Sequence, residues 1–496
     1  MADPVTAAGQ NPVPAGVQPA TLQTPVPVKN FAFLRHFWRP GPAAIEAELR
    51  PQFANPGFLT PTGVQVSRGS SPQKGLQDFV DDMLTAHQRL TKKPKIEELR
   101  FALVDLTGSK LFNPDYAEHN STTQGGVGST SKVGVMFAAF QLHFDLNAFA
   151  KKNPGLSTEA DLFSAIRAEW GKTQVLSGNP VVKQLHPGDA QVPKMELQDR
   201  LVKIEPRFHK SLTFPLPLHP KIGAPKLENM FTASPGASGA LEVKFQGSLS
   251  GTDAAQTFIN TNPENYGKVR ELSFGERMFI MIDDSDNAAS RSCVEDVGYL
   301  YINSALWQSD LYSPHRNGGV WIGSAYQDKS LRWIETPVPD RKQNAGDSFT
   351  AATPAAIAAI LTLIQQNRMI SQDISEQMRK LLSKRKSGLK RNFRGVLKPV
   401  SSFSRSFFEE ALTSMDPEAR PRVARFRLNE VFSKLGIANR FGDCIIVKRT
   451  DRGKELHYVA VGLDDELVFK LHELIIQLDI CIQQNNGLTP SPVPVP

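Results

Sequence analysis

The sequence predicts an α/β fold in which an antiparallel sheet is built from both ends of the chain and flanked by helices. Three observations lead to this fold class. Strand-like segments follow an amphipathic helix near residue 100, helical periodicity fills the middle of the chain, and a hairpin with a last amphipathic helix closes it. The strand-forming segments lie near the two ends of the chain. We therefore expect them to pair in one sheet, which buries their apolar faces against the helices.

The N-terminal elements are a helix, two strands and a second helix. Apolar residues recur at helical spacing in "GLQDFVDDML", residues 75–84. The segment "LRFALVDLTG" is typical of a buried strand followed by a turn, and "KLFNPDYAEHNST" of a possible second strand. A helix is then expected from Lys132 to about Lys151.

The later elements are mostly helical until a hairpin near the C-terminus. "FGERMFIMIDD" indicates an apolar helix end, and "PAAIAAILTLIQQNRMISQDISEQMRKLL" two helices, with Thr353 as N-cap and Pro354 at the first helical position. "GDCIIVKRTDRGKELHYVAVGL" alternates and turns at Asp-Arg-Gly, which predicts a hairpin. "DELVFKLHELIIQLDICIQQN" predicts the closing helix.

Composition divides the chain into one large domain and two tails. Residues 1–28 and 486–496 are rich in proline and small residues, which predicts disorder. Residues 29–74 are interpreted as a linker or docking segment, and 75–485 as the folded domain. Within the domain, residues 185–245 are rich in Pro and Gly, so a long insertion is expected at about 170–265.

The overall composition excludes several classes of protein. A net charge of +7 over 496 residues indicates a mildly basic surface and argues against a dedicated nucleic-acid binder. The three cysteines lie far apart, so neither a disulfide framework nor a metal site is expected. Without a signal-peptide pattern or an apolar run long enough to span a membrane, a cytoplasmic location is expected.

The stretch "GGVGSTSKVGVMFAAFQL" carries the first chemical motif, because Ser129 lies three residues before Lys132 at a loop-to-helix junction. At a helix start the dipole favours a developing alkoxide, and a lysine one turn later can accept the proton if burial has neutralised it. The alternative is an ordinary N-cap serine with a solvated lysine. The same spacing also occurs at Ser71, Ser383 and Ser387, so the pattern alone is weak.

Two further motifs follow along the chain. Ser285 and Asn287, in "MIDDSDNAAS", could relay a proton and hold a substrate carbonyl, or could simply end a helix with local hydrogen bonds. In "FSKLGIANRFGDCIIV", Lys434 and Gly436 precede an alternating strand, where a lysine could bind a carboxylate and glycine would leave room for a ligand. The alternative for that pair is a surface lysine and a turn glycine.

In this order the three motifs resemble those of the serine β-lactamase and penicillin-binding protein superfamily, and class A β-lactamases most closely. That family shows Ser-x-x-Lys, then Ser-Asp-Asn, then Lys-Thr-Gly. The likeness covers roughly residues 75–485. It implies a β-lactamase/transpeptidase-like α/β fold, with an antiparallel sheet flanked by helices, an all-helical subdomain and a Pro/Gly-rich insertion.

The resemblance also implies a role for each matching residue. Ser129 would be the acylated nucleophile and Lys132 its proton acceptor, while Ser285 would pass a proton to the leaving group. Asn287 would hold the substrate amide. Lys434 would bind a substrate carboxylate, Gly436 would line the substrate strand, and the backbone N–H groups of Ser129 and Ile437 would form the oxyanion hole.

The chain departs from the family pattern at two places. Leu435 replaces the hydroxyl residue of the third motif, although "KSG" at Lys386 to Gly388 retains it in a basic stretch without a strand behind it. No glutamate with an asparagine three residues later follows the second motif, so the deacylating base of class A enzymes has no match; Glu295 and Glu335 are the nearest candidates. Four aromatic residues nearby would rebuild the pocket or pack the core: Trp307, Tyr312, Trp321 and Tyr326.

The leading hypothesis is therefore a serine hydrolase that forms an acyl-enzyme on an amide or ester bearing a carboxylate, with no cofactor and no metal. One alternative is a catalytically weak or inactive relative that binds a ligand or partner. Another is a basic interaction protein, which rests only on the nine Lys/Arg residues between Arg379 and Lys398. A nucleic-acid partner and a transmembrane segment are not expected.

Overall fold

The computed structural model describes the parts of the chain that form the fold. These are residues 74–91, 96–172, 225–250, 266–322, 350–383, 389–391, 397–399, 427–437, 441–464 and 473–489, with gaps at 113, 124, 126, 238, 310 and 314–317. The predicted N-terminal tail, most of the predicted linker, and most of the predicted insertion lie outside these residues.

A five-stranded antiparallel sheet joins the two ends of the chain, in the order β11-β12-β13-β1-β2. The strands are β1 (Leu99–Asp105), β2 (Asp115–His119), β11 (Arg427–Ile437), β12 (Phe441–Asp451) and β13 (Lys454–Asp464). β13 pairs with β1 in the centre, with Leu103 opposite Ala460. The expected sheet of both chain ends is thus the observed one, and the predicted hairpin is β12–β13. Its two-residue turn has positive φ at Arg452 (50°) and Gly453 (81°), which suits the twist of the paired strands.

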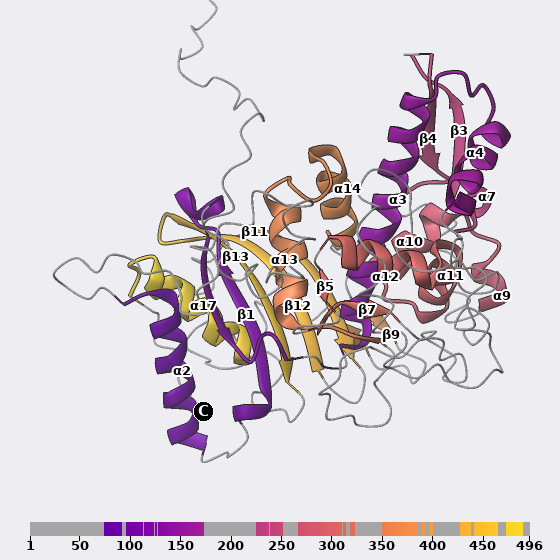
Figure 1. Cartoon of the computed structure of the whole chain (residues 1–496). Helices are drawn as coiled ribbons and strands as arrows, with labels where there is room; N and C mark the ends of the chain where they lie inside the picture. Colours follow the sequence, from indigo (N-terminus) through magenta and orange to yellow (C-terminus); the bar gives the residue numbers. More distant parts are fainter. Residues whose placement is uncertain are drawn as a thin grey trace, which may run out of the picture.

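Both faces of the sheet are covered, so every residue of β1 is buried. Leu99, Phe101 and Leu103 pack with α2 (Leu76–Thr91) and α17 (Glu473–Asn485), which lie together on one face (Figure 1). Ala102 and Val104 belong to the larger core on the other face, which α13 (Pro354–Gln365) covers. α13 begins as predicted: the Thr353 hydroxyl accepts a hydrogen bond from the Ala356 N–H at 3.3 Å, with Pro354 at the first helical position.

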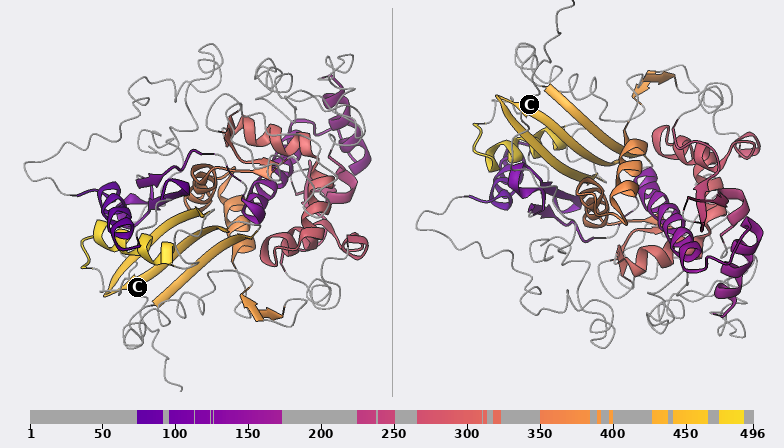
Figure 2. Two further views of the ribbon diagram at one scale, coloured as in Figure 1. Left: turned by 90° about the horizontal axis from the view of Figure 1, so that it is seen from below. Right: turned by 90° about the horizontal axis from the view of Figure 1, so that it is seen from above.

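Beyond α13 lies a helical region that shares the larger core (Figure 2). Its helices are α3 (Lys132–Lys152), α4 (Glu159–Lys172), α7 (Leu227–Met230), α9 (Tyr266–Val269), α10 (Phe274–Asp283), α11 (Asn287–Val297), α12 (Tyr299–Gln308) and α14 (Gln372–Leu382). Short strands complete it: β5 (Tyr312–Ser313), β6 (Gly318–Gly319), β7 (Trp321–Ile322) and β8 (Thr350–Ala351). Two more strands, β9 (Leu389–Arg391) and β10 (Leu397–Pro399), pair with each other. α3 is apolar and long enough to pass as a membrane span by length and composition, yet much of it is buried within the fold.

Part of the predicted insertion forms a hairpin rather than an aperiodic excursion. β3 (Phe231–Pro235) pairs with β4 (Leu241–Phe245), and Phe245 stacks on His143 of α3 with ring centroids 4.7 Å apart. The signal was present in "FTASPGASGALEVKF", where two short alternating segments flank turn residues. The high Pro and Gly content of the surrounding sequence led instead to the prediction of a long insertion without strands.

The last residues before the C-terminal tail are also ordered, although the sequence placed the tail boundary at 486. The Arg452 guanidinium donates to the Thr489 carbonyl at 2.6 Å, and Leu488 packs against the core shared by α2 and α17. The chain therefore remains on the body of the protein as far as Thr489, because a side chain from the hairpin turn holds it there.

Three carboxamide side chains close strand edges by bonding both backbone groups of one residue. Gln77 of α2 pairs with Glu118 of β2, at 2.9 and 3.1 Å. Asn147 of α3 pairs with Val243 of β4, at 3.0 and 3.1 Å. A third pair joins α12 to β7. A carboxamide has one acceptor and two donors, so it can replace a neighbouring strand at one position.

The carboxyl group of Asp145, on α3, lies where burial disfavours its charged form. The Gln141 amide donates to it at 2.9 Å and the Tyr301 hydroxyl at 3.4 Å. Burial against α12 raises the pKa of Asp145 to about 7, an effect that these two hydrogen bonds only partly oppose. A carboxyl group whose folded-state pKa lies above its unfolded value destabilises the fold when it ionises, so stability falls as the pH rises towards and through 7.

We therefore expect Asp145→Asn to stabilise the protein above pH 7 by at least about 1.4 kcal/mol, the equivalent of one pKa unit, with the gain shrinking towards pH 5. Asp81→Asn is the matched control, because the exposed Asp81 accepts the same bond from Gln77 at 2.9 Å. Urea unfolding of both variants between pH 5 and 8 measures the difference. A gain for Asp145→Asn that does not change with pH would contradict the assignment.

Candidate functional site

Ser129 lies in a short 3-10 turn, Gly128–Ser131, that leads directly into α3. The N-cap position of α3 is Ser131, so Ser129 is not the N-cap that the alternative required. The hydroxyls of Thr130 and Ser131 each donate to a carbonyl three residues back, at 2.7 Å. Ser129 is partly exposed, and its hydroxyl forms no hydrogen bond with any other residue that the structure describes. Among these three successive hydroxyls, only that of Ser129 has no such bond within the described residues.

Glycines before and after Ser129 allow the close approach of neighbouring segments. A Cβ atom on Gly125 would lie 1.9 Å from Nη1 of Arg100, a buried arginine of β1. Gly128 has a φ of 49°, which a glycine adopts at little cost. On α3 itself, a Cβ atom on Gly134 would lie 2.7 Å from a methyl carbon of Val320. Gly125 and Gly134 thus allow neighbouring side chains to approach closely, and Gly128 allows the positive φ of the turn.

Lys132 is the first residue of α3 and is fully buried. Its Nζ donates to the carbonyl of Ser285 at 2.7 Å and to Oδ1 of Asn287 at 2.9 Å. Two longer contacts, at 3.4 Å, reach the Ser285 hydroxyl and the Asp286 carbonyl. The structure thus brings the first two motifs together around one amine, although they are more than 150 residues apart in the chain.

The turn that meets Lys132 joins α10 to α11 and has a strained backbone. Ser285 has a φ of 61°, in the left-handed region that a residue with a side chain rarely adopts. The next residue, Asp286, is the N-cap of α11, since its carboxylate accepts the Ala289 N–H at 2.7 Å. Asn287 is then the first residue of α11, which directs its amide to the start of α3. The Asp before a run of small residues was the sequence signal for this cap.

Lys434 lies within β11, not ahead of a strand as the sequence suggested. It is fully buried and pairs with Cys444, whose thiol donates to the Lys434 carbonyl at 3.2 Å. Cys444 belongs to the larger core, so Lys434 faces the side of the sheet on which α3 and α13 lie. The Ser129 turn packs against β11 and β12 on this side. A buried lysine on the inner face excludes the interpretation of a solvated surface residue.

The other predicted residues of this strand follow Lys434 in register. Gly436 pairs with Gly442, and Ile437, the last residue of β11, pairs with Phe441. Leu435 alternates with Lys434 along the strand and pairs with Asp443. β11 is at the edge of the five-stranded sheet, and Phe432 on it forms an isolated antiparallel bridge with Ser383.

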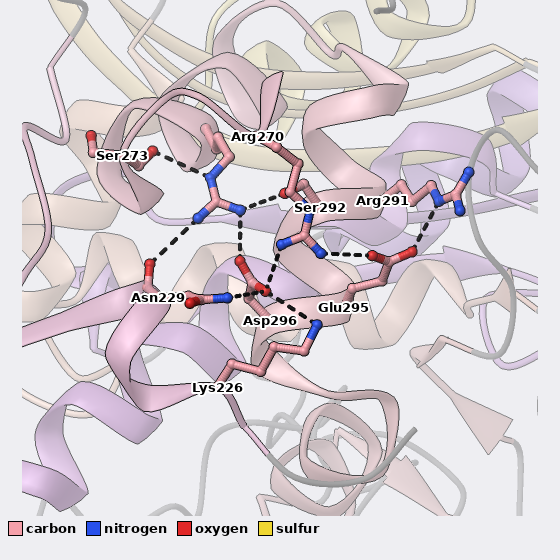
Figure 3. A network of polar contacts seen from close by, with 9 residues as sticks. Lys226, Asn229, Arg270, Ser273, Arg291, Ser292, Glu295 and Asp296 are labelled. Carbon is pink, nitrogen blue, oxygen red and sulfur yellow. Dashed lines mark hydrogen bonds and ion pairs between the residues drawn. The ribbon is translucent and has the colours of Figure 1, made fainter. Parts of the chain in front are cut away.

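Glu295 is held in an ion-pair network on α11 (Figure 3). Its carboxylate accepts from Arg291 at 2.9 Å and from Arg270 at 3.1 Å. Glu295 lies eight residues beyond Asn287 on α11, which corresponds to about 12 Å along a helix. The distance and the two arginines make it unsuitable as the base that activates a water at Ser129. Glu335 and the Lys386–Gly388 motif lie outside the described residues.

The same network also links α10 to α11. Arg277 donates to Asp296 at 2.6 Å and also to the Ser292 hydroxyl, and all three side chains are buried (Figure 3). Arg270 and Lys226 approach the other oxygen of Asp296, at 3.2 and 3.5 Å. The positive charges around it hold the pKa of Asp296 below its usual value in spite of burial. The pair of helices that carries Ser285 and Asn287 is therefore cross-linked at its far end.

The aromatic residues near the predicted pocket divide into two groups. Tyr312 and Trp321 are fully buried, with ring centroids 4.8 Å apart, so they pack the core and do not face a substrate. For Trp307 only the backbone is described, and Tyr326 lies outside the described residues. Within the described part of the chain, no cluster of His, Cys, Asp and Glu could hold a metal ion.

No protein-family model and no curated protein matches the chain. Solved structures that resemble it include several β-lactamases, each similar over most of its own length. A β-lactamase from Sphaerobacter thermophilus is 11% identical, with 83% of this chain and 98% of that one covered and a TM-score of 0.37. A class A β-lactamase from Bacteroides cellulosilyticus is 12% identical, with 84% and 99% covered and a TM-score of 0.37. At such values the matches say nothing about activity.

The strain at Ser285 gives a stability prediction. Replacing Ser285 by glycine should raise the free energy of unfolding relative to Ser285→Ala by about 1 kcal/mol, because both variants lose the hydroxyl while only glycine adopts a φ of 61° without steric cost. The Ser285 carbonyl that Lys132 contacts is retained in both. Chemical denaturation of the two variants measures the difference, and an alanine variant as stable as the glycine variant would contradict it.

Proposed function

We propose that the protein is a serine hydrolase that forms an acyl-enzyme at Ser129 on an amide or ester substrate bearing a carboxylate. The observation that carries the proposal is the buried Lys132 amine, which lies one helical turn after a partly exposed serine and contacts both Ser285 and Asn287. The order of the three motifs resembles that of class A β-lactamases and supports the same chemistry.

In the proposed first step the Ser129 oxygen attacks the substrate carbonyl carbon and its proton passes to Lys132. The two short bonds of Lys132, to the Ser285 carbonyl and to Asn287, account for two N–H donors. The step requires the neutral form of the amine, whose lone pair would accept the serine proton. The tetrahedral intermediate would be held by backbone N–H groups of Ser129 and Ile437.

In the second step the carbon–nitrogen or carbon–oxygen bond breaks and the leaving group takes up the proton. The Ser285 hydroxyl lies 3.4 Å from Lys132 Nζ and could relay that proton. Because Asn287 uses Oδ1 to accept from Lys132, its NH₂ group remains as a donor for the substrate amide carbonyl. Water would then hydrolyse the ester on Ser129 and restore the hydroxyl.

Intact mass spectrometry with fluorophosphonate and penicillin-type probes tests the proposal. The wild type should gain one probe mass, whereas Ser129→Ala and Lys132→Ala should not. Ser383→Ala is the matched control, since Ser383 has the same Ser-x-x-Lys spacing but lies at the end of α14, and it should react like the wild type. An adduct that persists in Ser129→Ala would contradict the assignment of the nucleophile.

Lys434 should affect binding of the substrate rather than the reaction. A bond to a charged group is typically worth about 1.5–3 kcal/mol, so Lys434→Met should weaken labelling by a carboxylate-bearing probe about tenfold to a hundredfold. Labelling by a neutral fluorophosphonate should change little. Equal losses with both probes would show that Lys434 supports the fold or the chemistry instead.

A second candidate function is a non-catalytic relative that binds a ligand in the same site. The ion pairs of Glu295 with two arginines favour it, since the nearest carboxylate after the second motif cannot serve as a deacylating base. Binding of a carboxylate-bearing amide by calorimetry, without any adduct at Ser129, is the result that would select this candidate. An adduct that forms and persists for minutes to hours would instead support acylation with slow hydrolysis.

A further inference from the structure

The turn that carries Ser129 is attached to a small ladder of backbone pairs. Gly125 and Ala352 exchange both backbone hydrogen bonds, each at 3.0 Å. Ala352 follows β8 directly, and β8 pairs with β7 so that Ile322 lies opposite Thr350. Backbone pairing therefore leads from β7, through β8, to a residue four positions before Ser129.

The outer edge of this ladder is closed by the side chain of Asn303, which comes from α12. Its NH₂ group donates to the Ile322 carbonyl at 2.7 Å, and its Oδ1 accepts the Ile322 N–H at 2.9 Å. Asn303 is 1% exposed and Ile322 is fully buried. Loss of the carboxamide would leave two buried backbone groups of β7 without these partners, which is costly in the absence of water.

α12 also belongs to the other half of the site. It follows α11 after Gly298, whose φ is 87°, and α11 begins at Asn287, which contacts Lys132. Asn303, on the helix that follows α11, therefore bonds the β7–β8 ladder. Through α11 it is connected to the Ser285–Asn287 turn, and through the ladder to the Ser129 turn. Within the described residues, the Lys132 contacts and this carboxamide both join the two halves.

We propose that Asn303 is a positioning residue: its carboxamide fixes the β7–β8 ladder and thereby sets the position of the Ser129 turn relative to Ser285 and Asn287. This inference rests on the proposed function for its effect on acylation. A change of about 1 Å in the position of a reacting group can lower a rate a hundredfold, so a residue that does not touch the substrate can control the rate.

The chain provides a matched control in Asn147. Its carboxamide bonds both backbone groups of Val243 in the same manner, at 3.0 and 3.1 Å, but among the described strands β4 pairs with β3 alone, in the insertion hairpin. Asn147→Ala and Asn303→Ala thus each remove a carboxamide that bonds both backbone groups of a buried strand residue, Val243 or Ile322, and Asn147→Ala also removes a bond to the His143 carbonyl at 3.0 Å. Of the two residues, only Asn303 bonds the β7–β8 ladder that leads to Gly125 and the Ser129 turn.

The experiment compares the rate of Ser129 labelling by a fluorophosphonate in the full-length variants, well below their unfolding temperatures. Asn303→Ala should lower the rate at least tenfold and Asn147→Ala less than twofold. Asn303→Asp keeps the acceptor and loses the donor, so its labelling rate should lie between those of the two alanine variants. This variant replaces Asn303→Ala in the comparison if Asn303→Ala does not fold. The midpoint of the pH profile should stay unchanged, because Lys132 is retained.

Hydrogen exchange provides a readout that does not need activity. Peptides containing Gly125 and Ala352 should exchange faster in Asn303→Ala than in the wild type, and should be unchanged in Asn147→Ala. Unchanged exchange there, or equal rate losses in the two alanine variants, would overturn the inference. If the wild type is not labelled at all, the proposed function fails, while the exchange comparison still decides whether Asn303 holds the Ser129 turn.

Discussion

The buried amine of Lys132 is the interaction on which the rest of the site depends. A lysine fully removed from solvent requires acceptors, and four that lie around its Nζ come from the three residues Ser285 to Asn287. The turn between α10 and α11 is therefore fixed against the start of α3. This contact also explains why Ser285 keeps a strained φ of 61°, because relaxing the backbone would move the carbonyl that Lys132 binds.

Two buried ion pairs hold the surrounding elements in place. Arg277 and Asp296 link α10 to α11 in the helical region, and Arg449 of β12 bonds Asp479 of α17 at 2.8 Å on the far face of the sheet. Tyr458 of β13 adds a hydrogen bond to the same Asp479, at 2.6 Å. Burying two charges brings little net stability, yet removing one partner typically costs about 3–5 kcal/mol. Such pairs fix where helices sit more than how stable the protein is.

The site lies where the sheet, built from chain ends more than 300 residues apart, meets the helical region. β11 supplies Lys434 from the C-terminal part, and the Ser129 turn comes from the N-terminal part. The pairing of β13 with β1 joins these two parts of the chain in one sheet. The apolar residues Val320 and Leu306 cover the side of α3 that follows Lys132, so that side of the helix is closed to water.

The sequence by itself determined the local elements and their order. Period-2 and period-3.6 patterns identified β1, the β12–β13 hairpin, α2, α3 and α13, because these depend on neighbours within a few residues. Since the strands lay at the two ends, the sheet could be predicted as well. The spacing of Ser129 and Lys132 likewise placed both at the start of one helix.

Only the tertiary structure decided which distant residues meet. Lys132 contacts Ser285 and Asn287, whereas Glu295 turns to two arginines. Local patterns could not separate these outcomes, because each depends on packing between helices that are far apart in sequence. Burial decided in the same way that Lys434 lies inside a strand on the inner face and that Trp321 packs the core. The type of a side chain limits which chemistry it can perform, while the fold sets the distances and the solvent access that this chemistry requires.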